Sequence, residues 1–308
     1  MAANNRNDFS SSGILQEWLQ REFLLNFNAN LYFADFAEAP VNPEGYDTLR
    51  WAVFTAIAES AVTTGTTSND GVTPSDTSIA VTSVTTTPTQ YRIVTNLSDM
   101  LLADNPLPLL QKTAERVGYV MSLKVDTVIQ TTIMAGTNVY YGGAAAARTA
   151  LAATDVLTVG LLNKAAAKLA SFDSPTFDGF YMAVVHPYSL YDLRNSTSTG
   201  SWLDISKYSQ PDKIYKGEIG ALFGVRVMVS SHVNTFSSTV TVYPTLVMGK
   251  QAFGMGWRQR PQVFITDMVP SDSDPAAQRR KVSAKAAFGV VRLQENSLIR
   301  IECGATSL

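Results

Sequence analysis

The sequence has little of the material from which reactive sites are built. It contains one cysteine, Cys303, and two histidines, His186 and His232. A single cysteine excludes an intramolecular disulfide and a cysteine-based metal cluster, and the lack of disulfides fits a reducing compartment. The two histidines stand apart, without the HxH or HxxxH spacing of a zinc site. We therefore expect no metal and no cofactor, and we interpret both histidines as structural or solvated.

Charge and long hydrophobic runs are also scarce. Charged residues make up 16% of the 308 residues, against about 25% in an average domain. The net charge of −2 and the pI of about 5.7 do not indicate a nucleic-acid groove, which normally shows a basic face. No apolar run approaches the ~18 residues of a transmembrane helix, and the polar N-terminus lacks a signal core. We expect a protein that is made in the cytoplasm and has no transmembrane helix. Its low charge indicates either a surface that is covered by other subunits or a polar surface that is rich in Ser and Thr.

Signatures of catalysis are missing as well. No GxSxG elbow occurs, and Gly249-Lys250 is not followed by the Ser or Thr of a phosphate-binding loop. A single carboxylate such as Asp126 is interpreted as part of a solvated helix face. The densest basic features are Arg258, Arg260 and residues 279–281, which either pair with neighbouring acids, the favoured interpretation, or contact a phosphate backbone loosely. The sequence therefore predicts that the protein is not an enzyme.

One stretch, residues 107–134, has the pattern of an unusually long helix. Asn105 is a candidate cap, and Pro106 or Pro108 can occupy the first turn. Such a helix exceeds the usual ~11–12 residues of a compact domain and predicts a rigid spine. Its apolar residues recur at spacings of three and four, on one face of a helix: Leu110, Ala114, Val117, Met121, Val125 and Val128.

The chain before this spine looks like extensions. Residues 1–11 are polar, and a helix beginning at Ser12 places Trp18 on an amphipathic face that packs either on its own domain or on a neighbour. Residues 47–95 predict a long two-stranded excursion whose turn is Asp70-Gly71. The part from Ser60 to Gln90 holds eleven threonines, and its only charges are two aspartates. A lone hairpin is marginal in water and needs a surface to lie on; the alternative is a low-complexity loop.

The chain after the spine mixes helices and strands, which predicts an α+β fold. We expect helices over 155–170, capped by Thr154 or Asp155, and over 188–194. We expect strands over 180–185, 240–248, 262–268, 281–291 and 298–303. Pro244 favours an edge position or a bulge for its strand, because proline lacks the amide donor. In 298–303, Arg300 and Glu302 point to the same side.

Two glycine-containing segments complete the set of candidate assembly and structural residues. Glycines allow tight turns and close backbone approach, and the segment around Arg226 alternates like a strand. No catalytic, cofactor or metal residues are assigned. The candidate structural residues are Trp18, Asp70, Gly71, Gly217, Glu218, Gly220, Gly224 and Arg226.

The order of these parts resembles the HK97-like fold of tailed-phage shell proteins. Three segments, AVVHPYSLYDLR (183–194), YKGEIG (215–220) and FGVRV (223–227), make it similar to the N4-like family of major capsid proteins. The resemblance implies a subunit that forms hexamers and pentamers in an icosahedral shell around the double-stranded DNA of a phage. It also implies weak unspecific contact with that DNA, and possible scaffolding, portal and decoration proteins as partners.

The resemblance implies a division of the chain as well. An N-terminal arm would cover 1–46 and an extended β loop 47–95. A peripheral domain with the spine would comprise 96–140 and 241–308, and an axial domain 141–240.

One departure from this pattern concerns covalent locking. Some shells of this fold are cross-linked by a Lys–Asn bond that starts on the extended loop, whereas the first lysine here is Lys112. We therefore expect non-covalent contacts between subunits. The alternatives are an encapsulin-like shell around a protein cargo and, from another class, a monomeric carbohydrate- or peptide-binding enzyme.

Overall fold

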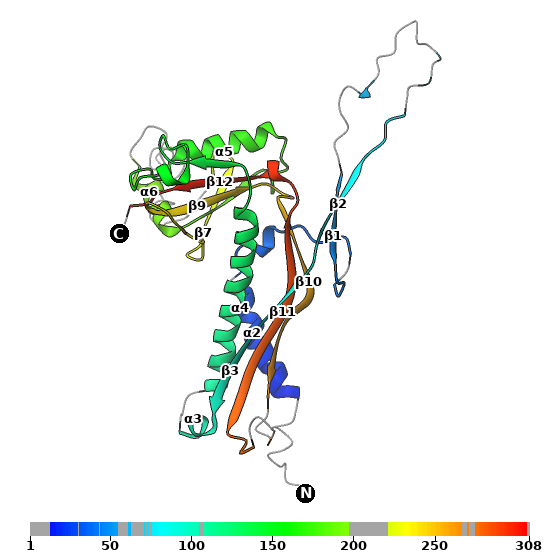
Figure 1. Ribbon diagram of the computed structural model, residues 1–308, viewed down its shortest axis with the longest axis vertical. Coiled ribbons are helices and arrows are strands. Elements are labelled where there is room, and N and C mark those ends of the chain that lie inside the picture. Colours follow the sequence, from blue (N-terminus) through cyan, green and yellow to red (C-terminus); the bar gives the residue numbers. More distant parts are fainter. Residues whose placement is uncertain are drawn as a thin grey trace.

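The computed structural model describes residues 13–29, 31–42, 44–54, 61–62, 71, 73, 76–104, 108–196, 221–266, 270 and 275–306. It has three parts (Figure 1). A long helix lies along a narrow sheet of three strands, a broader sheet with its own helices sits at one end of this shaft, and a hairpin projects from the side. The mixture of helices and strands confirms the α+β prediction.

The spine is helix α4 (Leu109–Met134), close to the predicted range. Its apolar face, including Val117, Val125 and Ile129, is buried in the main core. Pro108 occupies the N-cap position without a side-chain cap hydrogen bond, and the proposed cap Asn105 lies outside the described residues. The length of the apolar stripe was therefore a better guide to this helix than its capping residues.

Helix α2 (Gly13–Ala29) packs against the spine and the narrow sheet of its own chain. The backbones of α2 and α4 approach so closely that a Cβ on Gly118 would lie 2.7 Å from the carbonyl oxygen of Phe23. Gln20 of α2 also binds the sheet: its amide donates to Pro261 O (3.1 Å) and its oxygen accepts from Val263 N (2.7 Å). The described part of the expected arm 1–46 thus packs on its own body, through the apolar residues of α2 and through Gln20.

The narrow sheet has the strand order β10-β11-β3, all antiparallel. Its strands are β10 (Phe253–Ile265), β11 (Arg279–Arg292) and β3 (Thr89–Ser98). The short helix α3 (Asp99–Asp104) connects β3 to the start of the spine. Because β3 pairs with β11 along its whole length, residues 89–95 belong to this sheet, and the expected excursion 47–95 is corrected to end before them.

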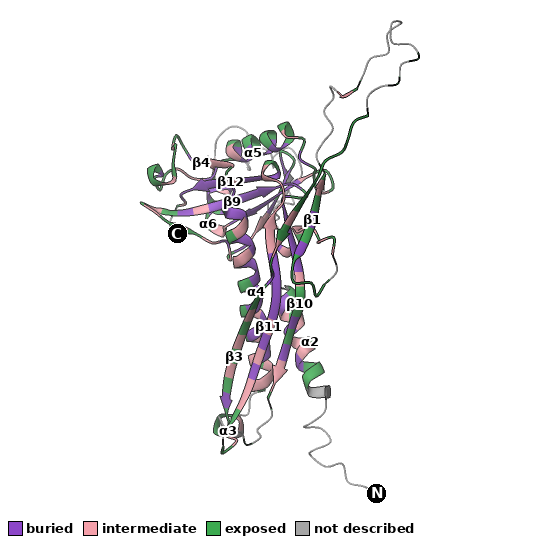
Figure 2. Ribbon diagram, turned by 45° about the vertical axis from the view of Figure 1, so that its right-hand side comes forward, coloured by how far each residue is buried: buried purple, intermediate pink, exposed green. Residues whose placement is uncertain are grey.

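The projecting hairpin consists of β1 (Leu49–Phe54) and β2 (Val81–Thr86), paired antiparallel from Leu49↔Thr86 to Phe54↔Val81. This pairing confirms the predicted outgoing and return strands. Gly71 has φ +79°, as a turn glycine does, and Asp70 lies outside the described residues. Figure 2 shows that the described outer residues of this hairpin are exposed, whereas purple buried residues run along β10 and β11.

The broad sheet has seven strands, with the order β4-β12-β9-β5-β7-β6 and β8 paired to β9. Helix α5 (Val159–Ser171) contributes to the core on one face of this sheet, and residues of the spine belong to the core on the other. Helix α6 (Pro187–Asn195) and the short 3-10 turns η1 (Ala34–Phe36), η3 (Arg148–Ala150) and η4 (Glu295–Ser297) complete the described elements. The strands are β4 (Val139–Tyr141), β5 (Tyr181–Val185), β6 (Ala221–Leu222), β7 (Val225–Val229), β8 (Phe236–Ser237), β9 (Thr241–Met248) and β12 (Leu298–Cys303).

Two expectations about β9 are wrong. Pro244 lies on an inner strand rather than at an edge, opposite Glu302 of β12. It is tolerated because the hydrogen-bond ladder on the other side of β9 is interrupted there: β5 pairs only as far as Leu246, and β8 pairs with Val242 and Thr241.

The second expectation concerns the domain boundary at 240/241. Such a boundary would cut this sheet, since β9 and β12 join β5 and β7 in one layer.

Helix α5 begins later than predicted. Its N-cap is Thr158, whose hydroxyl accepts from Leu161 N, rather than Thr154 or Asp155. Asp155 instead accepts a hydrogen bond from Ala152 N (2.8 Å) and stabilises the preceding turn. His186 caps α6, with Nδ1 accepting from Tyr188 N (3.2 Å). This histidine has the structural role that the sequence indicated.

Gly224 connects β6 to β7 with φ +75°, and no heavy atom lies within 4 Å of an added Cβ. The cost of a side chain here is therefore one of backbone strain, not of crowding. We expect Gly224→Val to lower the free energy of unfolding by roughly 1–2 kcal/mol, measured by urea unfolding. Gly224→Asn is the control, because asparagine tolerates this conformation and should cost clearly less. Equal stability of all three proteins would contradict this account.

Candidate functional site

The root of the hairpin is built on a strip of glycines. Phe253 and Met255 of β10 point into the main core, so Gly254 and Gly256 face the opposite side. There Trp51 of β1 lies so close that a Cβ on Gly254 would clash with its Nε1, and a Cβ on Gly256 would be only 2.9 Å from Cδ1 of Leu49. Trp51 is buried, and its indole donates to Glu38 O (3.0 Å). The hairpin is thus rigidly attached where it leaves the body.

Beyond this root the hairpin exposes apolar side chains. Phe54 is 67% exposed, Ile79 57% and Val81 54%. Apolar groups gathered on a projecting element mark a surface that another molecule covers. We therefore regard the hairpin as the main candidate assembly surface.

A buried polar stripe on the spine holds two other segments in place. The carboxylate of Asp126 accepts hydrogen bonds from Tyr32 N (3.1 Å) and Phe33 N (3.4 Å). One turn further on, the amide of Gln130 donates to His232 O (2.8 Å) and accepts from Asn234 N (2.6 Å). The expectation that Asp126 lies on a solvated face is wrong, because the segments that cover it come from distant parts of the chain.

Burial raises the pKa of Asp126 to about 6, although the N–H groups of Tyr32 and Phe33 act in the opposite direction and nearby Asp35 raises it slightly. The native protein therefore binds a proton between about pH 4 and pH 6 that the unfolded chain releases. A native state that binds more protons loses stability as the pH rises through this window. Asp126 is ionised at neutral pH at a cost in stability, which indicates that its hydrogen bonds define the position of the N-terminal segment.

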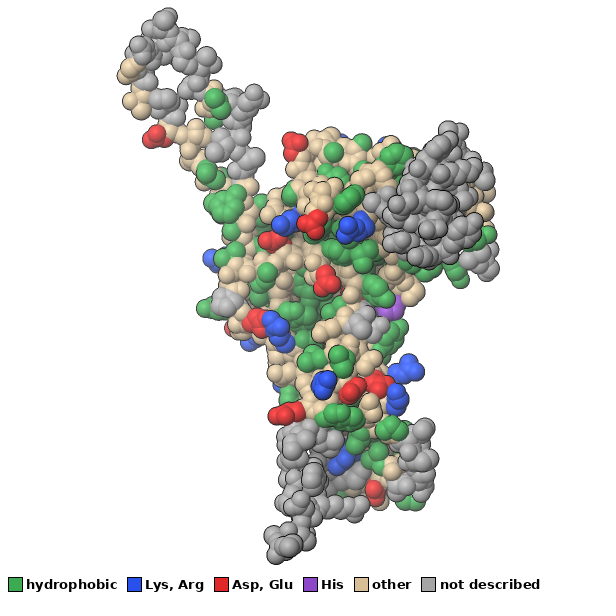
Figure 3. Space-filling model, turned by 180° about the vertical axis from the view of Figure 1, so that it is seen from behind, with side chains coloured by type: hydrophobic (Ala, Val, Ile, Leu, Met, Phe, Trp, Pro, Cys, Tyr) green, Lys and Arg blue, Asp and Glu red, His purple; other side chains and the backbone are tan. Residues whose placement is uncertain are grey.

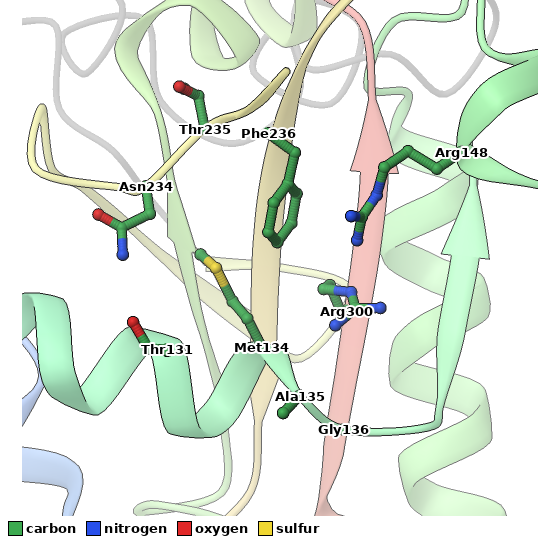
Figure 4. A pocket seen from close by; sticks show the side chains of 9 residues that line it. All are labelled: Thr131, Met134, Ala135, Gly136, Arg148, Asn234, Thr235, Phe236 and Arg300. Carbon is green, nitrogen blue, oxygen red and sulfur yellow. The ribbon is translucent and has the colours of Figure 1, made fainter. Parts of the chain in front are cut away.

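The broad sheet carries a second charged cluster. Glu302 of β12 is fully buried, and Arg148 binds it through Nε–Oε2 (2.7 Å) and Nη2–Oε1 (2.5 Å). Arg300 lies next to it, with Nε 2.7 Å from Oε1. Both arginines line a hollow of about 720 Å³ between the end of α4 and β8 (Figure 4). Sequence analysis placed Arg300 and Glu302 on the same side of their strand, but nothing there indicated Arg148.

Two of the other predicted basic residues form exposed surface pairs. Arg258 binds Asp47 (2.6 Å) and Arg260 binds Glu44 (2.7 Å), which confirms the ion-pair interpretation for these two residues. In the face shown in Figure 3, the coloured Lys and Arg side chains lie scattered among acidic and polar ones, without a basic stripe.

The structure places only some of the candidate residues. Trp18 of α2 is 41% exposed, far along the shaft from the broad sheet. Gly224 and Arg226 lie together at the start of β7, where the guanidinium of Arg226 lies 5.3 Å from the ring centroid of Phe180. Gly217, Glu218 and Gly220 lie outside the described residues, as Asp70 does. Their roles remain predictions.

Comparison with known proteins shows the family to which this chain belongs. The model of a family described as phage capsid protein matches residues 81–301, which is most of the chain. The chain belongs to the phage capsid protein family. No curated protein sequence matches it. Among its described parts, no helix is long and apolar enough to cross a membrane, and no cluster of three potential metal ligands occurs.

Solved structures show that the capsid protein has the HK97-like fold. The capsid of Ralstonia phage GP4 is similar with a TM-score of 0.68 and 17% identity, over 88% of this chain and 86% of that one. The capsid of cyanophage Pam1 has a TM-score of 0.67 and 13% identity, over 90% and 92%. A virus-like particle from Pyrococcus furiosus has a TM-score of 0.54 and 8% identity, over 93% and 99%. The predicted HK97-like fold is therefore confirmed.

The titration of Asp126 yields a prediction that isolates one group. In unfolding experiments on the unassembled capsid protein, the stability difference between wild type and Asp126→Asn should shift by up to about 3 kcal/mol from pH 4 to pH 7. The wild type becomes less stable relative to Asp126→Asn as the pH rises, because only the wild type has a carboxylate that must ionise in a buried position. Urea unfolding over this pH range measures the difference, and other carboxylates cancel in it. A difference that does not change with pH would contradict the assignment.

Proposed function

We propose that this major capsid protein builds the icosahedral shell around the double-stranded DNA genome of a tailed phage, as hexamers and pentamers. Membership of the phage capsid family supports a structural role in the virion rather than an enzymatic one. The observation that carries the proposal is the hairpin, which is rigidly rooted at Trp51 and exposes apolar side chains beyond it. Assembly would take place in the host cytoplasm, and the segments at 183–194 and 223–227 favour an N4-like relationship.

The physics of such a shell is that of many weak, oriented contacts. Each subunit presents different surfaces to its neighbours, and such head-to-tail contacts close into rings when the rotation between subunits allows it. A subunit that is held by one neighbour meets the next at high effective concentration, so the individual contacts need not be strong. Weak contacts also let a misplaced subunit leave during assembly.

The two sheets suggest how the subunit is divided. We propose that the peripheral domain consists of α2, α4 and the narrow sheet, and that the axial domain consists of the seven-stranded sheet with α5 and α6. Accordingly β9 and β12 belong to the axial domain, and the boundary lies between the sheets rather than at residue 240. The apolar side chains of the hairpin would be buried on an adjacent subunit, where its strands can extend a sheet.

Contact with the genome would be weak and unspecific. With a net charge of −2, the capsid protein has no excess of positive charge to neutralise phosphates. Scaffolding, portal and decoration proteins would be partners of the shell.

The runner-up is a shell around a protein cargo. The Pyrococcus furiosus particle shares the fold, but the matched family model is that of phage capsid proteins, which favours the phage head. The content of purified particles, DNA or packed enzyme, distinguishes the two.

The role of the hairpin can be tested by shortening it. Since Phe54 and Val81 are the last paired residues, residues 55–80 can be replaced by Asn-Gly, the preferred two-residue hairpin turn. We expect a soluble, folded protein that forms no closed particles, as judged by circular dichroism and electron microscopy. Normal shells from this variant would refute the proposed role of the hairpin.

A second prediction concerns covalent locking. Because no lysine precedes Lys112, the hairpin cannot supply the amine of a Lys–Asn cross-link. Mature particles that are fully denatured should therefore run as single chains of 33.4 kDa in gel electrophoresis. A ladder of covalent multimers under reducing conditions would show that the shell is cross-linked by another route.

A further inference from the structure

The hollow at the end of the spine contains an uncompensated positive charge. Of the residues that line it, only Arg148 and Arg300 are charged, and both contact the carboxylate of the buried Glu302. The carboxylate of Glu295 lies close to the lining residue Gly136, and its charge is paired with Arg292. Oε1 of Glu302 is shared by both guanidinium groups, and Oε2 is bound by Arg148. The two cations and one anion leave one net positive charge at the hollow.

Arg300 is poorly satisfied in this arrangement. Its side chain is only 11% exposed, and its Nε, although close to Glu302, forms no hydrogen bond of acceptable geometry. Burial lowers the pKa of this guanidinium, against the effect of Glu302. Arg148, by contrast, is 34% exposed and stacks on Phe236 with 3.8 Å between guanidinium carbon and ring centroid. A second anion entering the hollow would meet a fixed, partly dehydrated pair of cations.

The hairpin region has the complementary charge. Residues 51–91 contain three acidic residues, Glu59, Asp70 and Asp76, and no Lys or Arg. The rest of the chain therefore carries a net charge of +1, because the whole chain carries −2 and this stretch −3. Asp76 is exposed and lies in the described residues 76–80, which lead directly into β2. The hairpin to which β2 belongs projects from the side of the subunit (Figure 1).

We propose that the hollow formed by Arg148, Arg300 and Phe236 receives a carboxylate from the acidic hairpin of a second copy of this chain, with Asp76 as the donor. This inference rests on the proposed assembly of the shell and adds a defined polar contact to the apolar one. The contact would fix the register of the hairpin, because a carboxylate between two guanidinium groups accepts hydrogen bonds only in a narrow range of positions.

Chemical cross-linking tests the contact in assembled particles. Thr235 is exposed at the hollow, and the only native thiol, Cys303, is buried. We expect the double variant Asp76→Cys with Thr235→Cys, assembled and treated with a short bis-maleimide, to give a ladder of multimers on a denaturing gel. The control pairs Asp76→Cys with Thr266→Cys, which is exposed at the far end of the narrow sheet and should give single chains.

The charge is tested separately with Asp76→Asn. Loss of this ion pair should raise the subunit concentration needed for assembly about fivefold, which corresponds to about 1 kcal/mol for one partly exposed pair. Asp47→Asn is the matched control, since Asp47 is 81% exposed and pairs with Arg258 away from the hollow. It should leave the threshold unchanged.

Each result has one meaning. A ladder from the Thr235 pair alone, with a raised threshold for Asp76→Asn, supports the contact. Closed particles without that ladder, or with an equal ladder from the Thr266 pair, overturn it while the proposed shell function stands. An unchanged threshold for Asp76→Asn together with a lower DNA content in Arg148→Gln particles also overturns it, and assigns the hollow to a phosphate of the enclosed DNA. Failure of the wild-type chain to form particles would instead refute the proposed function.

Discussion

The positions of two irregular segments of the subunit depend on polar side chains that α4 buries in its otherwise apolar face. Asp126 binds the backbone N–H groups of residues 32 and 33, and Gln130 binds the backbone on both sides of residue 233. Buried backbone groups need partners, and here one helix supplies them for two segments that have no regular structure of their own. Burying the Asp126 carboxylate costs stability. Its hydrogen bonds nevertheless fix the segment of residues 32 and 33 in one position, whereas an apolar side chain would allow several.

A second constraint concerns the connection between the rigid body and the projecting hairpin. Glycines on β10 and β11 leave room for Trp51 and Leu49, so the hairpin root is in tight contact with the narrow sheet. In the described residues beyond this root, Phe54, Ile79 and Val81 are exposed. Rigid attachment and an uncovered surface together fit an element that reaches a neighbour, because a flexible attachment would add an entropic cost to every contact.

Much of the architecture could be predicted from local patterns. The apolar period of three and four in residues 107–134 predicted the spine, and alternating residues predicted β12 within its observed bounds. Such patterns work because the face of a helix or strand that meets the core follows from its repeat. The prediction was wrong where the environment of a residue depends on distant parts of the chain. Asp126 is buried by residues 32 and 33, and Pro244 is tolerated inside a sheet because β5 stops pairing with β9 at Leu246.

The sequence by itself was sufficient to indicate the family: the order of arm, hairpin, spine and mixed body, with the segments at 183–194, 215–220 and 223–227, resembles that of phage capsid proteins. The order of parts and these short segments are properties of the local sequence, and the match over residues 81–301 confirms the family that they indicated. Only the tertiary structure decided that β9 and β12 join β5 and β7 in the seven-stranded sheet, and that Arg148 meets Arg300 on Glu302. These residues are separated by about half the chain, and no local repeat encodes which of them come into contact.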